Sequence, residues 1–189
     1  MQRVADIVFW LAIMLWFALA IVGGVAAMAI FPAARELPIS MAGYESFIAD
    51  EPVLGRQLVA GFLVERVFEV AQAPRLILAT IATAALVAQC WFAYRANTRE
   101  PLRGLRVAAL VCAFGALLVS FVAIAGFRGA DNKYRALASD DRWRAEALAT
   151  KPFVDDAHAF ASRAMTVEVV TLLALAGLTA AGIGARRRA

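Results

Sequence analysis

Four long runs of apolar residues dominate the pattern of hydrophobic and polar positions along the chain. Residues 107–127 contain no charged side chain and follow directly after Arg103 and Arg106. At ~1.5 Å rise per residue, a helix over this run crosses the ~30 Å hydrocarbon layer of a bilayer. We therefore expect residues 107–127 to form a membrane-spanning helix.

Three further runs have the same character. Residues 7–31 and 76–94 are uncharged, and residues 164–185 carry Glu168 as their one charged side chain. A cleavable secretory signal is the competing interpretation of the first run, because a basic residue precedes it and Ala-Met-Ala at 27–29 resembles a cleavage site. The apolar core of such signals is only ~7–15 residues long, so we expect residues 7–31 to remain as a membrane helix.

Prolines predict where the first helices begin and end. Pro32 cannot continue a helix and disfavours helical backbone at Phe31, so we expect the first helix to end there. Residues 32–51 are polar and rich in turn formers, and Pro52 suits the first turn of a new helix. Residues 53–73 are helical in pattern but carry too many charges for a lipid-facing span. They predict a helical extension outside the membrane that continues past a kink at Pro74 into residues 76–94.

The segment after the third run is charged and mixed. Ser139, followed by Asp140 and Asp141, predicts a helix start, because a hydroxyl group can cap a helix and acids favour its positive end. Pro152 is expected to break this helix and to start another that continues into residues 164–185. Residues 140–163 are thus predicted to be helical and outside the membrane.

The predicted fold is therefore all-α: a single polytopic membrane domain over residues 1–189, with four transmembrane helices and helical extramembrane extensions. Hydrophobic residues make up 62% of the chain, against ~45–50% in ordinary globular proteins, which favours the same class.

Charge adds a prediction of sidedness. The net charge is +4, and all basic residues except Lys133 and Lys151 are arginines. Seven of the 17 arginines lie in the short segments 95–106 and 186–188, so their density is high beside the ends of apolar runs. This pattern favours anchoring in the cytoplasmic (inner) membrane over nucleic-acid binding, with both termini and the 95–106 loop in the cytoplasm.

Two groups of polar residues near the last run are candidates for chemistry. Asp155, the single histidine His158 and Ser162 share one helical face by their spacing, which suits a proton relay or a transient metal ligand. The alternative is a helix start whose acids favour the dipole while His158 packs at the interface. Glu168 lies inside an apolar run, where a carboxylate is costly and is a functional candidate by default. It could equally form a structural ion pair with Arg163 or Arg75.

Glu65, Arg66 and Glu69 form the other polar cluster in an apolar context. Glu65 and Glu69 share a helical face, and Arg66 is three residues from Glu69. They could line a path together with Glu168, or they could be a solvated face with one ion pair.

Several enzyme classes lack their required residues. Cys90 and Cys112 are far apart, and the chain has no CxxC motif, Cys/His cluster, HExxH motif or phosphate-binding loop. A single histidine cannot supply a bis-histidine haem site. We expect no enzyme activity, no cofactor and no metal.

Residues 31–38 (FPAARELP), Gly43 and the late pair His158 and Ser162 carry a resemblance to a known family. They resemble small four-span bacterial membrane proteins of unknown function, which are related to a eukaryotic transmembrane protein linked to platinum-drug resistance. The resemblance covers residues 7–95 and 153–185. In the family the serine follows the histidine by three residues, whereas here it follows by four. The resemblance implies no settled activity and marks His158 as a family-like position.

Two functions follow as hypotheses. The first is a structural or accessory component of a membrane assembly, with the lipid bilayer and other membrane subunits as partners. The second is a small solute or ion transporter or channel whose ionisable path uses Glu65, Glu69, His158 and Glu168.

Overall fold

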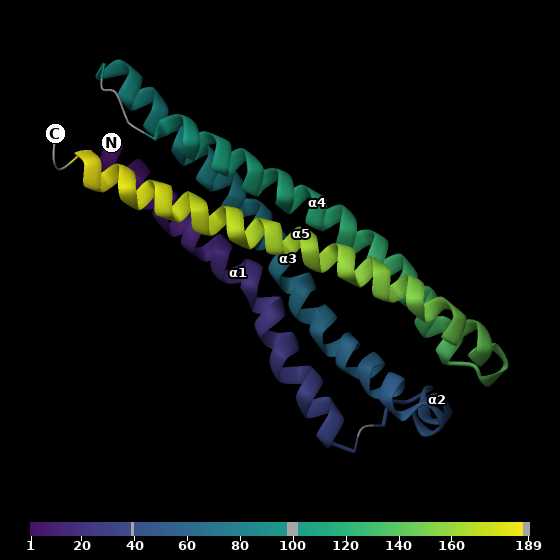
Figure 1. The fold of residues 1–189 in the computed structure, drawn as a ribbon. Coiled ribbons are helices and arrows are strands. Elements are labelled where there is room, and N and C mark those ends of the chain that lie inside the picture. Colours follow the sequence, from purple (N-terminus) through teal and green to yellow (C-terminus); the bar gives the residue numbers. More distant parts are fainter. Residues whose placement is uncertain (39, 98–101, 187–189) are drawn as a thin grey trace. The chain divides into compact units, whose positions relative to one another are not determined.

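The described residues fold into helices without any strand. The computed structural model describes residues 1–38, 40–97 and 102–186 (Figure 1). The elements, in order, are α1 (Gln2–Glu36), α2 (Glu45–Asp50), α3 (Pro52–Arg95), α4 (Arg103–Ala138), the 3-10 helix η1 (Asp141–Trp143) and α5 (Arg144–Arg186). Four helical stretches, α1, α3, α4 and η1 with α5, are long and apolar enough to cross a membrane. The predicted all-α fold with four such helices is confirmed.

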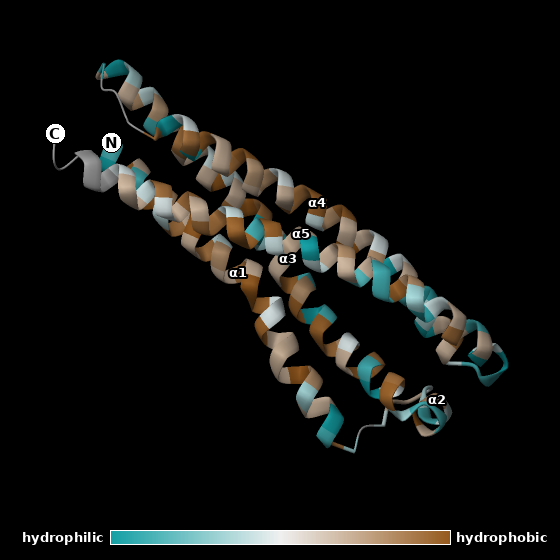
Figure 2. Ribbon diagram, viewed as in Figure 1, coloured by the Kyte–Doolittle hydropathy of each residue, from teal (hydrophilic) through white to brown (hydrophobic). Residues whose placement is uncertain are grey.

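Each of the four long helices contributes to two compact units. The first unit comprises Met1–Ile21, Ala71–Val119 and the chain from Ala164 onward, and the second comprises Val22–Val70 and Ser120–Arg163. Along the helices, hydrophobic residues predominate in the runs identified above, and hydrophilic residues gather at α2 and at the connection between α4 and α5 (Figure 2). The first unit thus holds most of the predicted spans, and the second holds most of the charged helical segments.

In the first unit, helical spacing brings one face of each helix inward. On this part of α1 the buried apolar side chains are Phe9, Ala12, Ile13, Trp16 and Ala20, which are spaced as on one face of a helix. This periodicity places them on one stripe of the helix. Leu11, Leu15 and other large apolar side chains on the remaining faces stay exposed, as expected of a helix that meets lipid.

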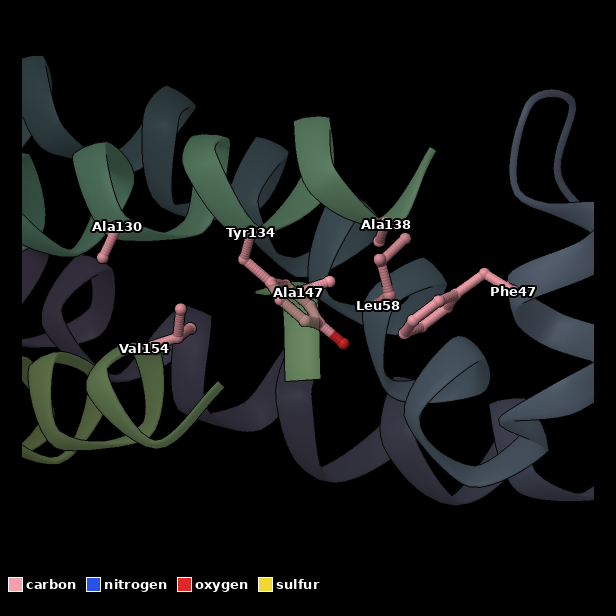
Figure 3. Packing of buried hydrophobic residues seen from close by; sticks show 7 residues of the cluster. All are labelled: Phe47, Leu58, Ala130, Tyr134, Ala138, Ala147 and Val154. Carbon is pink, nitrogen blue, oxygen red and sulfur yellow. The ribbon is translucent and has the colours of Figure 1, made fainter. Parts of the chain in front are cut away.

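The second unit has a hydrophobic core of its own. Its buried members come from α2, α3, α4 and α5 and are shown in Figure 3: Phe47, Leu58, Ala130, Tyr134, Ala138, Ala147 and Val154. The rings of Phe47 and Tyr134 meet edge to face, with centroids 6.1 Å apart. This geometry is favourable for aromatic pairs and fixes α2 against α4.

Helix α2 is an element that the sequence pattern did not predict. Residues 32–51 were expected to be turn-rich, yet Glu45–Asp50 form a short helix whose Phe47 is fully buried. Its backbone passes so close to α3 that a Cβ atom built on Gly55 would lie 2.8 Å from the Cα of Ile48. A glycine at position 55 is therefore needed for this packing.

The predicted helix boundaries at two prolines are wrong. Helix α1 continues through Pro32 to Glu36, and α5 runs unbroken through Pro152. A proline removes one backbone hydrogen bond, and both helices tolerate this loss because neighbouring residues hold them by packing. Beyond Pro152, Val154 is buried in the core of the second unit. The predicted start at Pro52 and the continuation of α3 through Pro74 are confirmed.

The turn after α4 and the loop between α3 and α4 lie where the sequence predicted them, but the residue that caps the turn differs. The turn after α4 is capped by Asp140, whose carboxylate accepts a hydrogen bond from the backbone N–H of Arg142 at 3.0 Å. Ser139 was expected to cap there, but its hydroxyl donates to the carbonyl of Ala136 instead. The arginine-rich loop is confirmed as short, because α3 ends at Arg95 and α4 begins at Arg103. Arg99 lies outside the described residues.

Helix α1 packs closely on α3 at Gly23, and this contact constrains the depth of residues 53–73 relative to the bilayer. A Cβ atom built on Gly23 would collide with the ring of Phe68. Gly23 belongs to the run 7–31, predicted to lie in lipid, whereas Phe68 belongs to the segment 53–73, predicted to lie outside. Since these neighbours share one depth, either the bilayer reaches this part of α3 or the last turns of α1 extend beyond it.

Candidate functional site

Glu168 is the centre of a buried polar site in the first unit. Its Oε1 atom accepts a hydrogen bond from the indole Nε1 of Trp16 at 2.7 Å and one from Nε of Arg75 at 3.3 Å. Nη2 of Arg75 donates a second hydrogen bond, to Oε2 of Glu168. The side chains of Arg75 and Glu168 are 1% and 0% exposed, so this ion pair is removed from solvent.

The sequence brings these three residues together by helical periodicity. On α5, Ala161, Glu168 and Leu175 are buried at intervals of seven residues, so Glu168 occupies the inward stripe of its helix. On α3 the buried stripe runs from Arg75 through Ala79 and Ala82. Each polar residue therefore replaces an apolar one at a core position.

This arrangement neutralises the carboxylate inside the protein. The Arg75 guanidinium approaches it with two N–H groups in a fork, which gives strong charge-assisted hydrogen bonds. Trp16 adds a neutral donor that fixes the orientation of Oε1. Of the two arginines that the sequence offered as partners for Glu168, Arg75 is in contact with it. Trp16 was missed, because an apolar stripe gives no sign that an indole N–H has a partner.

Glu65, Arg66 and Glu69 lie in the second unit within a network of ion pairs. Arg66 binds Glu69 at 2.8 Å along α3, which is the single pair that the sequence suggested. Glu65 accepts a hydrogen bond at 2.6 Å from Arg135 of α4. Arg128, also on α4, lies 3.7 Å from Glu65 and 3.5 Å from Glu69.

The α4 half of this network was not predicted. Arg135 is almost fully buried, pairs with Asp131 one turn earlier on α4, and lies 3.7 Å above the ring centroid of Phe62. Such a cation–π contact adds to the ion pairs in holding α3 to α4. The available signal was the spacing of Arg128, Asp131 and Arg135, which places all three on one helical face. A second missed contact lies in the first unit, where Arg106 donates to Oε1 of Gln89 at 2.6 Å.

Asp155, His158 and Ser162 lie on the same helix, α5, as expected. Asp155 accepts a hydrogen bond from Lys151 one turn earlier. The exposed imidazole of His158 meets the ring of Phe127 edge to face, with centroids 5.6 Å apart. Ser162 is half-buried. The described contacts of Asp155 and His158 thus lead to different neighbours, and a relay between them stays a prediction.

Metal and redox chemistry have few candidate ligands in the described chain. Residues 1–38, 40–97 and 102–186 hold no group of three His, Cys, Asp or Glu side chains with the geometry of a metal site. Cys90 is half-buried and Cys112 is exposed, and both are free thiols. The arrangement that the structure does provide is a set of arginine–carboxylate pairs that join helices.

Comparison of the chain with known protein families, curated proteins and solved structures finds no match. No protein-family model matches the chain, and no curated protein or solved structure is significantly similar to it. The resemblance to small four-span membrane proteins therefore stays a prediction.

Proposed function

We propose that this chain is a multi-pass protein of the cytoplasmic membrane that serves as a structural or accessory component of a membrane assembly. The observation that carries the proposal is the pairing of Glu168. This carboxylate is the one charged residue of the last apolar run, and it is bound by Arg75 and Trp16 with 0% exposure. A coupling carboxylate in a transporter needs access to water or substrate, whereas this one joins α1, α3 and α5.

The second unit supports the same function. Glu65 and Glu69, the remaining acids of the transport hypothesis, each contact arginines that link α3 to α4. Large apolar side chains meanwhile stay exposed on every long helix, for example Met28, Val70, Val122 and Phe160. Such surfaces fit contact with lipid and with other membrane helices.

Purification in a mild detergent from the membranes of the native cell tests the accessory role. The full chain carries an affinity tag and passes through two successive columns, and protein stoichiometry is then measured. We expect a membrane partner at a fixed ratio to the chain across independent preparations. A lone monodisperse monomer in every detergent tried would contradict the proposal.

Proton flux in proteoliposomes tests the competing transport hypothesis. We expect wild-type protein and a Glu168→Gln variant to give the same flux as empty liposomes. A wild-type flux that disappears in Glu168→Gln, but survives in the control Arg142→Gln, whose side chain is 83% exposed and lies outside the proposed path, would favour a transporter. Fusing a reporter to either chain end checks the topology, and we expect both ends on the cytoplasmic side.

A further inference from the structure

A cavity of about 360 Å³ lies in the second unit, where the last turns of α1 face the first turns of α3. Its lining residues are Phe31, Arg35, Val53, Arg56 and Gln57. This volume falls within the range of ~300–1,000 Å³ that is typical of small-molecule sites. We refer to it below as the α1–α3 cavity.

Two arginines give the α1–α3 cavity its charge. Over the described residues, neither Arg35 nor Arg56 has a carboxylate within ion-pair distance. Arg56 donates one N–H to the backbone carbonyl of Arg35 at 2.5 Å, which ties both arginines to the same rim. The acids nearest to the lining residues in the sequence, Glu36 and Glu51, do not line the cavity. The remaining guanidinium N–H groups suit phosphate oxygens, which they bind in a fork.

Apolar side chains give the same cavity a second character. Phe31 and Val53 line it beside the arginines, and Val53 is 68% exposed. On α1, the exposed side chains Val22, Val25 and Met28 recur every three residues and lead toward this end of the helix. Exposed apolar side chains in such a row suit contact with lipid. The first basic residue beyond this row is Arg35, which lines the cavity.

We propose that the α1–α3 cavity binds the phosphate-bearing headgroup of an anionic phospholipid. Arg35 and Arg56 hold the phosphate oxygens, and Phe31 and Val53 contact the apolar part of the same molecule. A free phosphate ion would use the arginines alone and would leave both apolar side chains without a partner. The positive end of the α3 dipole, which begins at Pro52, favours the same anion.

Native mass spectrometry of the full chain tests this site. The protein is reconstituted in discs that contain phosphatidylglycerol and phosphatidylcholine in equal amounts, then released into detergent, and the lipids retained are counted. We expect wild-type protein to retain phosphatidylglycerol in preference to phosphatidylcholine. Arg35→Gln should weaken phosphatidylglycerol retention about tenfold, because a charge-assisted fork is lost. This variant keeps the Arg35 carbonyl to which Arg56 donates.

Two further variants separate the site from general charge and from misfolding. Arg66→Gln removes the same charge from an arginine of α3 whose side chain is 83% exposed and does not line the cavity, so retention should be unchanged. Gln57→Glu adds a carboxylate of nearly the same size to the lining and should lower retention while both arginines stay in place. If Arg35→Gln fails to fold, Gln57→Glu still decides the question.

Three results would overturn the proposal. Equal retention of both lipids would show that charge on the headgroup is not recognised. An equal loss in Arg66→Gln would indicate general electrostatic attraction. Displacement of the lipid by millimolar inorganic phosphate would identify a site for a free anion. None of these results depends on whether the chain assembles with a partner.

Discussion

Arginine–carboxylate pairs join helices in both units, but they do so in different ways. In the first unit a single carboxylate, Glu168, meets Arg75 and Trp16, and both members of the ion pair are at most 1% exposed. In the second unit Glu65 contacts both Arg135 and Arg128, and the carboxylate is 19% exposed. In the first unit one arginine neutralises one buried carboxylate. In the second unit two arginines share a carboxylate that water can partly reach.

The difference teaches where a single substitution matters. Removing one member of a buried pair leaves an uncompensated charge away from water, which costs more than the pair itself contributes. Where several arginines surround one acid and water is near, the remaining groups compensate. We therefore expect the first unit to be sensitive to single charge changes and the second to tolerate them.

The largest effect is expected for Arg75→Met. This change removes the cation beside the buried Glu168 carboxylate, to which Trp16 still donates a hydrogen bond, and we expect a loss of about 3–5 kcal/mol in the free energy of unfolding. Unfolding in mixed micelles, followed by circular dichroism during titration with a denaturing detergent, measures it. The double variant Arg75→Met/Glu168→Gln removes both charges and keeps an acceptor for Trp16. It should be more stable than Arg75→Met alone, and equal losses in both would contradict a buried ion pair.

A smaller effect is expected where α1 packs on α3 without any charge. In Gly23→Ala the new methyl group meets the ring of Phe68, so the helices must separate or the ring must move. We expect a loss of about 1–3 kcal/mol, as for other overpacked sites. Gly24→Ala is the matched control, because a Cβ atom there has no neighbour within 4 Å. It should be neutral or stabilise the helix by about 0.5–1 kcal/mol, and similar losses in both variants would contradict this contact.

In the second unit, Arg135→Gln should cost less than Arg75→Met. Glu65 keeps Arg128 at 3.7 Å, and water reaches part of the site. We expect a loss of about 1–2 kcal/mol, between the values for exposed and buried pairs. Arg66→Gln breaks an exposed pair on one helix and should change stability by less than about 0.5 kcal/mol. A loss for Arg135→Gln as large as that for Arg75→Met would remove the distinction between the units.

Much of the helical architecture could be predicted from the sequence, because apolar runs of spanning length leave few alternatives. The partner of Glu168 could be narrowed to two arginines, since an acid in such a run needs a nearby cation. Trp16 could not be identified, because contacts across helices depend on rotation and register that no local pattern specifies. The spacing in the sequence places Arg128, Asp131 and Arg135 on one helical face. Nothing in the sequence indicated that Glu65 lies opposite that face.

Other features depend on tertiary packing that overrides local rules. Helix α2 has only six residues, too few for a recognisable period, and Phe47 fixes it to Tyr134. Pro32 and Pro152 lie inside helices because the surrounding turns are held by their neighbours. The position of residues 53–73 relative to the bilayer could not be inferred from their charges alone, because Glu65 and Glu69 form ion pairs with arginines on α4.

The smallest effect is expected at the end of the second unit where α2 meets the turn before α5. The hydroxyl of Ser46 donates to Asp141, and this hydrogen bond, with help from Arg144, lowers the pKa of that carboxyl. Hydrogen bonds from Arg142 likewise lower the pKa of Asp140. A carboxyl whose folded pKa is depressed stabilises the fold above its unfolded pKa of about 3.9, and loses that contribution as the pH falls through the lower folded value.

Stability should therefore be constant with respect to these two groups near neutral pH and should decrease slightly below about pH 4. Asp141→Asn removes one of the two titrations and should flatten this part of the profile of melting temperature against pH. Ser46→Ala should flatten it in the same direction, because Ser46 is the main cause of the lowered pKa of Asp141. Ser46 and Asp141 are both exposed, so solvent screens their contact. We therefore expect the loss of stability in either variant to be smaller than that in Arg135→Gln. An acid profile that is unchanged in both variants would show that α2 is held by Phe47 and the close approach at Gly55, with no contribution from these charges.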